Sequence, residues 1–300
     1  MVNLTFMRVL ITGGKGLLGN SLLKTSPSNR DIVWTYFKNP PQTNVPNAVY
    51  MDLSNEHTIE NVFSNFIPDW VIHTAGNGNV DWCEKNKEEA YRINVEGTEN
   101  IVFACKQYKA KIMYISSNAV FDGNNPPYKE TDLATPVNFY GHTKIICEHI
   151  VKAFIEDSVI VRPILMYGWD SEGERSNPVT WLIKALREHK TVKMVEDIYV
   201  NPLYVDDCAH GIWKIVESGK NGIYNFAGNE CMSRYEMALQ TAEVWGLDKF
   251  LIEPVKNAYF KDIAPRPFNT CYDTTKMEKN LGIKPRSFKE GLLLMKKEME

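Results

Sequence analysis

Residues 8–24 are the feature of this 300-residue chain that most limits its possible folds. The apolar, β-branched run "RVLIT" ends in "GGKGLLG", and a helical pattern follows at once. Gly13, Gly16 and Gly19 therefore stand between a strand and a helix, with the spacing G-x-x-G-x-x-G. Glycines there permit a tight turn, close backbone approach to a pyrophosphate and close helix–strand packing, and the free N–H groups of the helix attract phosphates. The segment predicts nucleotide binding, with an ordinary tight turn as the alternative.

The same alternation continues along the first half of the chain. Apolar runs at 31–37, 69–76, 110–117 and 158–163 are separated by helical patterns at 57–66, 86–108 and 140–154. Strands that are apolar throughout and separated by helices indicate a parallel sheet covered on both faces. We expect an α/β fold, a Rossmann-type doubly wound parallel sheet over residues 1–163.

After Pro163 the pattern loosens. Helical patterns occur at 179–189, 206–217, 233–245, 274–281 and 288–299, with a strand pattern at 222–228. We expect residues 164–300 to form mainly a smaller substrate-binding lobe, with residues 206–228 returning to the first domain.

Composition excludes some classes of protein. The formal net charge is −3, which argues against a broad nucleic-acid surface. No apolar run approaches the roughly 20 residues of a membrane span, and the run at the start is too short for a signal peptide. The six cysteines show neither Cys-x-x-Cys nor zinc spacing. We expect reduced thiols, no metal site, no membrane contact and a cytoplasmic protein. The cysteines are Cys83, Cys105, Cys147, Cys208, Cys231 and Cys271.

"FYGHTK" places Tyr140 four residues before Lys144. Residues four apart on a helix share one face and can touch. A neighbouring cation favours the charged form of a phenol, so the pair could transfer a proton. The alternative is a solvated helix start.

Two other segments end at the same predicted sheet edge. Ser116 and Ser117 follow one apolar run, and Thr74, Ala75 and Gly76 follow the run before it. Ligands of open parallel sheets bind at the carboxyl ends of the strands. We therefore expect the serines near the nicotinamide and the small residues beneath a dinucleotide.

The end of the second strand bears on the type of cofactor. NAD-binding proteins usually carry an acidic residue there, whereas this chain has "WTYFKNPP". Lys38 could pair with a 2′-phosphate, which favours NADP over NAD, or be a plain surface lysine. Asp52 could meet the adenine amine or cap a helix that starts near Ser54.

Taken in order, "TGGKGLLG", "ISSNAVFDG", "YGHTK" and "VRP" resemble the extended short-chain dehydrogenase/reductase superfamily. Within it, "VFDG", "EDIYVNPLYVDDCA" and "APRPFNTCYDTTKMEKNLG" are similar to dTDP-4-dehydrorhamnose reductases. The resemblance implies NAD(P)H-dependent reduction of the 4-keto group of a nucleotide-linked 6-deoxysugar, and a homodimer is typical of the superfamily. Tyr140 would be the general acid, Ser117 would hydrogen-bond the carbonyl, and Lys144 would hold the nicotinamide ribose. Arg266 would meet the substrate diphosphate or be a surface arginine.

The chain departs from that pattern in two places. Asn118 stands where an aspartate is common, and Leu165 and Met166 replace a tryptophan that stacks on the sugar. An NAD-dependent nucleotide-sugar epimerase remains an alternative. So does a non-catalytic regulatory subunit of the methionine adenosyltransferase type. Asn118-Ala119 disfavours a dehydratase.

The resulting assignments form three sets. The catalytic residues are Ser117, Tyr140 and Lys144. The residues expected to contact NADPH or NADH are Gly13, Gly16, Leu17, Leu18, Gly19, Lys38, Asp52, Leu53, Thr74, Ala75, Gly76, Asn94, Tyr140, Lys144 and Arg162. The residues expected to contact the substrate are Asn118, Val120, Asn201 and Arg266.

Overall fold

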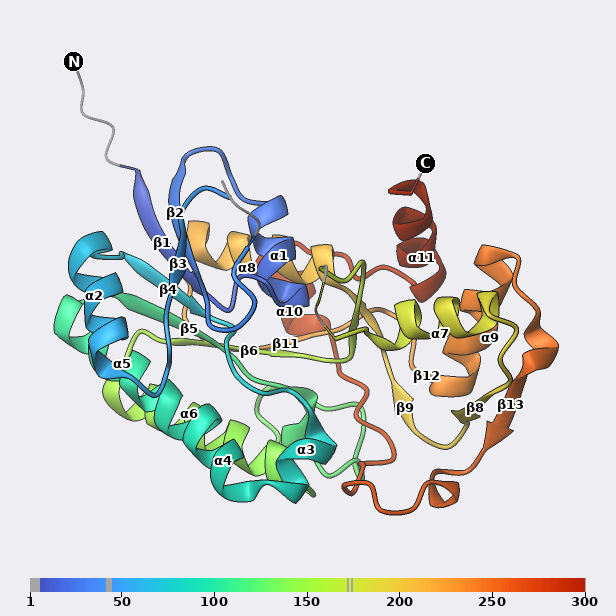
Figure 1. The fold of residues 1–300 in the computed structure, drawn as a ribbon. Helices are drawn as coiled ribbons and strands as arrows, with labels where there is room; N and C mark the ends of the chain where they lie inside the picture. Colours follow the sequence, from blue (N-terminus) through green and yellow to red (C-terminus); the bar gives the residue numbers. More distant parts are fainter. Residues whose placement is uncertain (1–5, 42–44, 172, 174, 300) are drawn as a thin grey trace.

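The computed structural model describes residues 6–41, 45–171, 173 and 175–299. A seven-stranded sheet has the order β11-β6-β5-β4-β1-β2-β3, and all its neighbouring strands are parallel (Figure 1). The order reverses at β1, which confirms the predicted doubly wound α/β sheet. The strands are β1 Met7–Thr12, β2 Arg30–Tyr36, β3 Ala48–Tyr50, β4 Trp70–His73, β5 Lys111–Ile115, β6 Val159–Pro163 and β11 Gly222–Phe226.

Helices cover both faces of this sheet. Alternate strand residues point to opposite faces, so Val9 and Ile11 join one apolar core and Leu10 joins the other. The first core contains α1 and α8, and the second contains α2, α5 and α6. The bounds are α1 Leu17–Lys24, α8 Val205–Ser218, α2 Glu56–Phe66, α5 Gly97–Tyr108 and α6 Phe139–Phe154.

The helical pattern expected at 86–108 is present but contains a π-helical turn. α3 (Val80–Lys85) comes first, and α4 (Lys87–Tyr91), the π turn (Arg92–Glu96) and α5 then follow one another without a break. Such turns often occur at functional sites. Here the turn carries Asn94.

The C-terminal half builds a second layer of structure beside the sheet (Figure 1). α7 (Pro178–Arg187), β8 (Val192–Val195), α9 (Arg234–Trp245) and β13 (Ile252–Val255) share an apolar cluster of their own. β11 and α8 belong instead to the sheet and its cover. The remaining elements are β7 Met166–Tyr167, β9 Tyr199–Val200, β10 Leu203–Tyr204, β12 Met232–Ser233, α10 Thr275–Leu281, α11 Phe288–Lys297, and 3-10 turns at Asn118–Val120, Lys249–Leu251 and Asn257–Tyr259.

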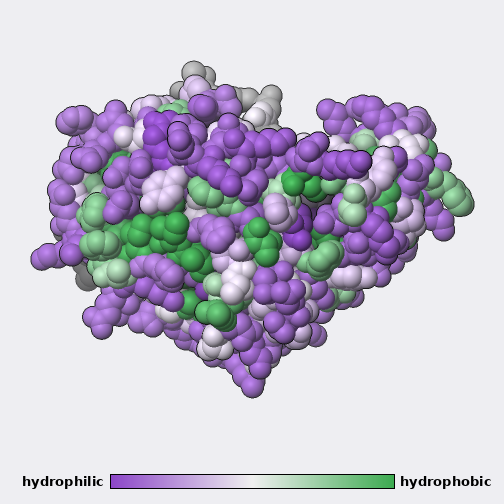
Figure 2. All heavy atoms as spheres, turned by 90° about the horizontal axis from the view of Figure 1, so that it is seen from below, coloured by the Kyte–Doolittle hydropathy of each residue, from purple (hydrophilic) through white to green (hydrophobic). Residues whose placement is uncertain are grey.

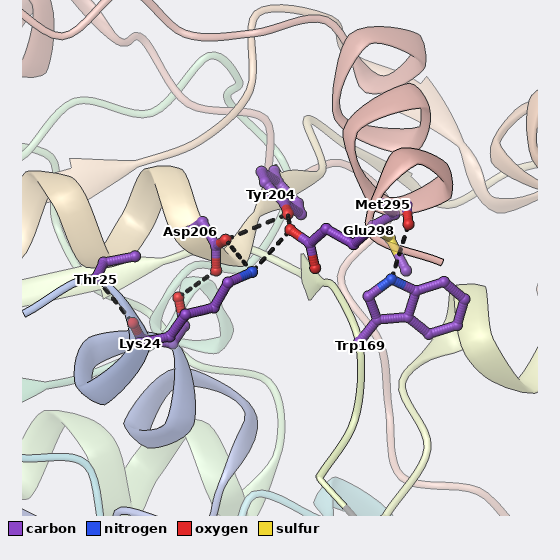
Figure 3. Close-up of polar contacts among 8 residues, drawn as sticks. Lys24, Thr25, Trp169, Tyr204, Asp206, Met295 and Glu298 are labelled. Carbon is purple, nitrogen blue, oxygen red and sulfur yellow. Dashed lines mark hydrogen bonds and ion pairs between the residues drawn. The ribbon is translucent and has the colours of Figure 1, made fainter. Parts of the chain in front are cut away.

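Polar contacts tie the C-terminal helix to the half of the molecule that contains the large sheet (Figure 3). Lys24 Nζ lies 3.0 Å from a carboxylate oxygen of Asp206 and 2.7 Å from one of Glu298. Trp169 Nε1 donates to the carbonyl oxygen of Met295 at 2.8 Å. Exposed ion pairs contribute little singly, but this network joins α1, α8 and the chain just after α11.

The expectation that all cysteines are reduced thiols is wrong for two of the six. Cys231 and Cys271 form a disulfide with a Cα–Cα distance of 5.8 Å. The fold brings them together because Met232 pairs with Val200, and Tyr199 in turn bridges to Asn269. The other four, which are Cys83, Cys105, Cys147 and Cys208, are free and buried.

Among the helices that the structure describes, none is both long and apolar enough to span a bilayer. Seen from below, apolar side chains gather toward the side where α5 and α6 lie (Figure 2). Phe103 on α5 and Phe154 on α6 are 45% and 39% exposed, with ring centroids 5.2 Å apart.

Candidate active site

A cavity of about 1550 Å³ opens at the carboxyl ends of β1, β4 and β5 and extends to the C-terminal lobe. It gathers most of the residues assigned from the sequence. Those that line it are Gly13, Gly16, Leu17, Leu18, Gly19, Lys38, Asp52, Leu53, Thr74, Ala75, Gly76, Ser117, Asn118, Tyr140, Lys144 and Arg266.

The glycine turn fits a phosphate group. Gly13 has a φ of +71°, a backbone conformation that favours glycine. A Cβ at Gly19 would lie 2.3 Å from the Gly13 carbonyl oxygen, so no side chain fits between turn and helix. Gly16 caps α1 without a side-chain hydrogen bond. The first N–H groups of the helix thus remain available for an anion.

The charge of the cavity wall also suits anionic ligands. Among the residues that the structure describes, eight basic and two acidic side chains line it, although the whole chain carries a net charge of −3. A concave site of one sign attracts ligands of the other. The basic residues are Lys15, Lys38, Arg92, Lys144, Arg175, Lys193, Arg234 and Arg266, and the acidic ones are Asp52 and Glu89. The sequence alone had not pointed to Lys15, Arg92, Arg175, Lys193 or Arg234.

Lys38 and Asp52 line the part of this cavity that follows β2 and β3. Lys38 Nζ lies 5.5 Å from the centroid of the Phe37 ring. Asp52 does not cap a helix near Ser54, as one alternative held: α2 begins at Glu56, and Asn55 caps it by accepting from a backbone N–H. Asp52 accepts instead from the Ser54 backbone N–H at 2.9 Å.

Tyr140 and Lys144 lie on the cavity side of α6. Asn138 caps the helix by accepting from Gly141 N–H at 2.9 Å. Lys144 Nζ is 5.7 Å from the Tyr140 ring centroid and donates to the Ile115 carbonyl oxygen at 2.9 Å. The Tyr140 hydroxyl has no hydrogen-bond partner within the described ranges, so it is free to meet a ligand.

Ser117 follows β5 and faces the same space. Its hydroxyl accepts from the Ala119 backbone N–H at 3.2 Å and lies 3.4 Å from Asn118 Oδ1. Asn118 Nδ2 in turn donates to Thr270 Oγ1 at 2.7 Å. The segment that carries Ser117 is therefore braced against the C-terminal half of the chain.

Arg162, assigned to the cofactor, lies outside the cavity lining. Its side chain is buried and donates to Glu148 through Nε at 2.8 Å and Nη2 at 2.6 Å. Ser116 Oγ donates to the same carboxylate at 2.6 Å. Glu148 on α6 thus holds Arg162 of β6 and Ser116 after β5 together behind the site. The positive charge of Arg162 is balanced by this carboxylate.

Three further assigned residues lie behind the lining as well. Asn94 holds the loop after β4: Oδ1 accepts from Asn77 N–H at 2.7 Å, and Nδ2 donates to the Asn77 carbonyl at 3.1 Å. Asn201 makes the same two-way contact with the backbone of Tyr272. Val120 is fully buried in the core. None of the three side chains lines the cavity. They can influence the site only by holding in place the backbone segments around them.

His73, at the end of β4, was not noticed in the sequence. It is fully buried, and its ring nitrogens lie 2.7 Å from Thr12 Oγ1 and 3.1 Å from Thr98 Oγ1. Burial, with a smaller contribution from the charge of Lys144, lowers the pKa of His73 to about 3. It is therefore a neutral core residue at physiological pH. The described residues contain no cluster of three or more His, Cys, Asp or Glu side chains placed to hold a metal ion.

A glycine turn at β1, a Tyr-x-x-x-Lys pair on α6 and a serine after β5, all on one doubly wound sheet, define the extended short-chain dehydrogenase/reductase fold. The family model described as the RmlD substrate binding domain matches residues 7–300, and the chain belongs to this family. The resemblance found in the sequence is thereby confirmed.

Relatives within this family carry different names. Methionine adenosyltransferase 2 subunit beta of Xenopus tropicalis is 31% identical over 95% of this chain and 86% of its own length. dTDP-4-dehydrorhamnose reductase of Aggregatibacter actinomycetemcomitans is 28% identical over 95% of this chain and 97% of its own. The crystal structure of dTDP-4-dehydrorhamnose reductase from Bacillus anthracis in complex with NADP superposes with a TM-score of 0.88. It shares 28% identity and covers 97% of this chain and 99% of that one.

Proposed function

We propose that this protein uses NADPH or NADH to reduce the 4-keto group of a nucleotide-linked 6-deoxysugar. The observation that carries the proposal is that Ser117, Tyr140 and Lys144 line the same cavity as the glycine turn. The similarity to dTDP-4-dehydrorhamnose reductases supports it.

The residues of the cavity fit a nicotinamide dinucleotide. Gly13, Gly16 and Gly19 would accept its pyrophosphate at the start of α1, and Lys144 would hold its nicotinamide ribose. Lys38 would meet a 2′-phosphate, which favours NADPH. When bound, the dinucleotide supplies the hydride.

Tyr140 supplies the proton in this proposal. Its hydroxyl donates a hydrogen bond to the carbonyl oxygen of the substrate and gives up the proton as that oxygen gains charge. Ser117 Oγ donates a second hydrogen bond to the same oxygen. Lys144, one turn along α6, stabilises the phenolate that remains. Hydrogen-bond donors that the protein holds in position before the reaction stabilise the charge that develops in the transition state.

The first test follows NADPH absorbance with dTDP-4-keto-6-deoxy-L-mannose generated in situ. Tyr140→Phe is expected to retain NADPH binding and to lose activity on the order of 100-fold or more. Tyr91→Phe, at an exposed tyrosine outside the cavity lining, is the matched control. Full activity in Tyr140→Phe would refute the assigned role.

A second test addresses the choice of cofactor. Lys38→Ala is expected to weaken NADPH binding on the order of 10-fold, because a charge-assisted contact to the phosphate is lost. NADH binding should hardly change. Lys85→Ala, outside the lining, is the control, and equal losses for both dinucleotides would remove the argument for NADP.

A regulatory role is the second candidate, favoured by the 31% identity to a methionine adenosyltransferase subunit. Cofactor binding without any NADPH oxidation, together with altered kinetics of an added methionine adenosyltransferase catalytic subunit, would support it. A homodimer, a cytoplasmic location and the epimerase alternative stay predictions, and light scattering tests the first of them.

A further inference from the structure

Arg234 is a cavity cation whose guanidinium the fold leaves incompletely bonded. It is the first residue of α9 and lines the cavity in the C-terminal lobe. Its Nη1 atom is buried and has no hydrogen-bond partner among the residues described. A buried donor of a charged group costs stability when it stays unpaired. A ligand that accepts from it would remove that cost.

The acidic residue nearest to Arg234 along α9 is already engaged, and the neighbouring arginine has its own acidic partner. Glu236, two residues along α9, accepts from the Ser233 backbone N–H at 2.7 Å in a capping box. Arg266, the other cavity arginine of the lobe, is paired with Asp81 at 2.8 Å. The charge of Arg266 is therefore largely balanced by Asp81, whereas no ion pair among the residues that the structure describes includes Arg234.

The fold also sets these two arginines near each other. The disulfide between Cys231 and Cys271 joins a position three residues before Arg234 to one five residues after Arg266. Burial, and then the field of Arg266, lowers the pKa of Arg234 to about 10. Arg234 therefore remains a cation at neutral pH, and the lobe end of the cavity carries two guanidinium groups.

This anion-attracting end is separate from the glycine turn. The turn joins β1 to α1 near the middle of the molecule, whereas α9 lies in the C-terminal lobe (Figure 1). The dinucleotide phosphates would be satisfied at the first site. The cations of the lobe then remain available to a second anionic ligand.

We propose that Arg234, rather than Arg266, is the principal phosphate-binding residue for the substrate, meeting the diphosphate of the nucleotide sugar. Arg266 completes the site and is oriented by Asp81. This assignment rests on the proposed function for its substrate class, but it concerns binding and needs no turnover.

The test is calorimetric binding of dTDP, a diphosphate without the reacting sugar, to the full chain saturated with NADPH. Arg234→Gln is expected to weaken dTDP binding about 10- to 100-fold, the effect of losing a charge-assisted hydrogen bond. Arg234→Lys should recover most of the affinity because it restores the charge. NADPH affinity should stay within about twofold in both variants. Arg187→Gln, at an exposed position in the last turn of α7, should bind dTDP like the wild type.

Unchanged dTDP affinity in Arg234→Gln would overturn the assignment. Equal losses of dTDP and NADPH affinity would do so too, since they would show a general defect or place Arg234 in the cofactor site. So would a wild-type protein that does not bind dTDP. Failure of the reductase proposal looks different: NADPH oxidation is absent while dTDP binding and its dependence on Arg234 persist.

Discussion

The buried pair of Glu148 and Arg162 offers a quantitative test of how α6 is held. Glu148 is 1% exposed and Arg162 3% exposed. The carboxylate accepts two bonds from the guanidinium and one from Ser116. Glu148→Gln preserves the shape but leaves the guanidinium without its counter-charge. Removing one partner of a buried ion pair typically costs about 3–5 kcal/mol.

That cost is large enough to measure by thermal and urea unfolding. For chains somewhat shorter than this one, each kcal/mol shifts the melting temperature by roughly 2–4 °C, so Glu148→Gln should melt on the order of 10 °C lower. Glu188→Gln, which breaks an exposed pair with Lys190, is the control and should melt like the wild type.

The reasoning also predicts a recovery. In the double variant Glu148→Met with Arg162→Met, both charges are absent, so much of the lost stability should return. A loss below about 1 kcal/mol in Glu148→Gln, or a double variant less stable than the single one, would refute the account of a buried charge pair.

Three further predictions concern acid stability, the disulfide and the glycine turn. The pKa of His73 is lowered to about 3 from 6.5. The unfolded chain therefore binds a proton that the folded one does not, and stability should fall by about 2 kcal/mol between pH 6.5 and pH 5. His73→Asn should remove that part of the pH dependence in urea titrations. The Cys231–Cys271 disulfide closes a 40-residue separation, so Cys231→Ser should lose about 2–4 kcal/mol of unfolding free energy. A reducing agent that destabilises this variant as much as the wild type would contradict the assignment. Gly19→Ala would place a Cβ 2.3 Å from the Gly13 carbonyl oxygen, so its NADPH affinity by fluorescence titration should fall, and an unchanged affinity would show that the turn is not the binding element.

Much of the fold, and the glycine turn and the Tyr140–Lys144 pair of the site, could be predicted from the sequence because they depend on contacts between near neighbours. Apolar runs and helical periodicity reflect backbone geometry over a few residues, and the doubly wound parallel sheet was predicted from them. The glycine turn and the Tyr140–Lys144 pair are of the same kind. The glycines occur where a strand pattern meets a helix pattern. The spacing of four residues places the side chains of Tyr140 and Lys144 on one face of a helix.

Only the tertiary structure decided which distant residues meet. Arg162 was expected at the cofactor, but its charge is bound by Glu148 on α6. Cys231 and Cys271 become partners through strands that pair across the C-terminal lobe. Arg234 reaches the cavity because α9 packs against the rest of that lobe. Contacts between residues far apart in the sequence depend on how helices and strands pack against one another. No pattern within a short stretch of sequence predicts them.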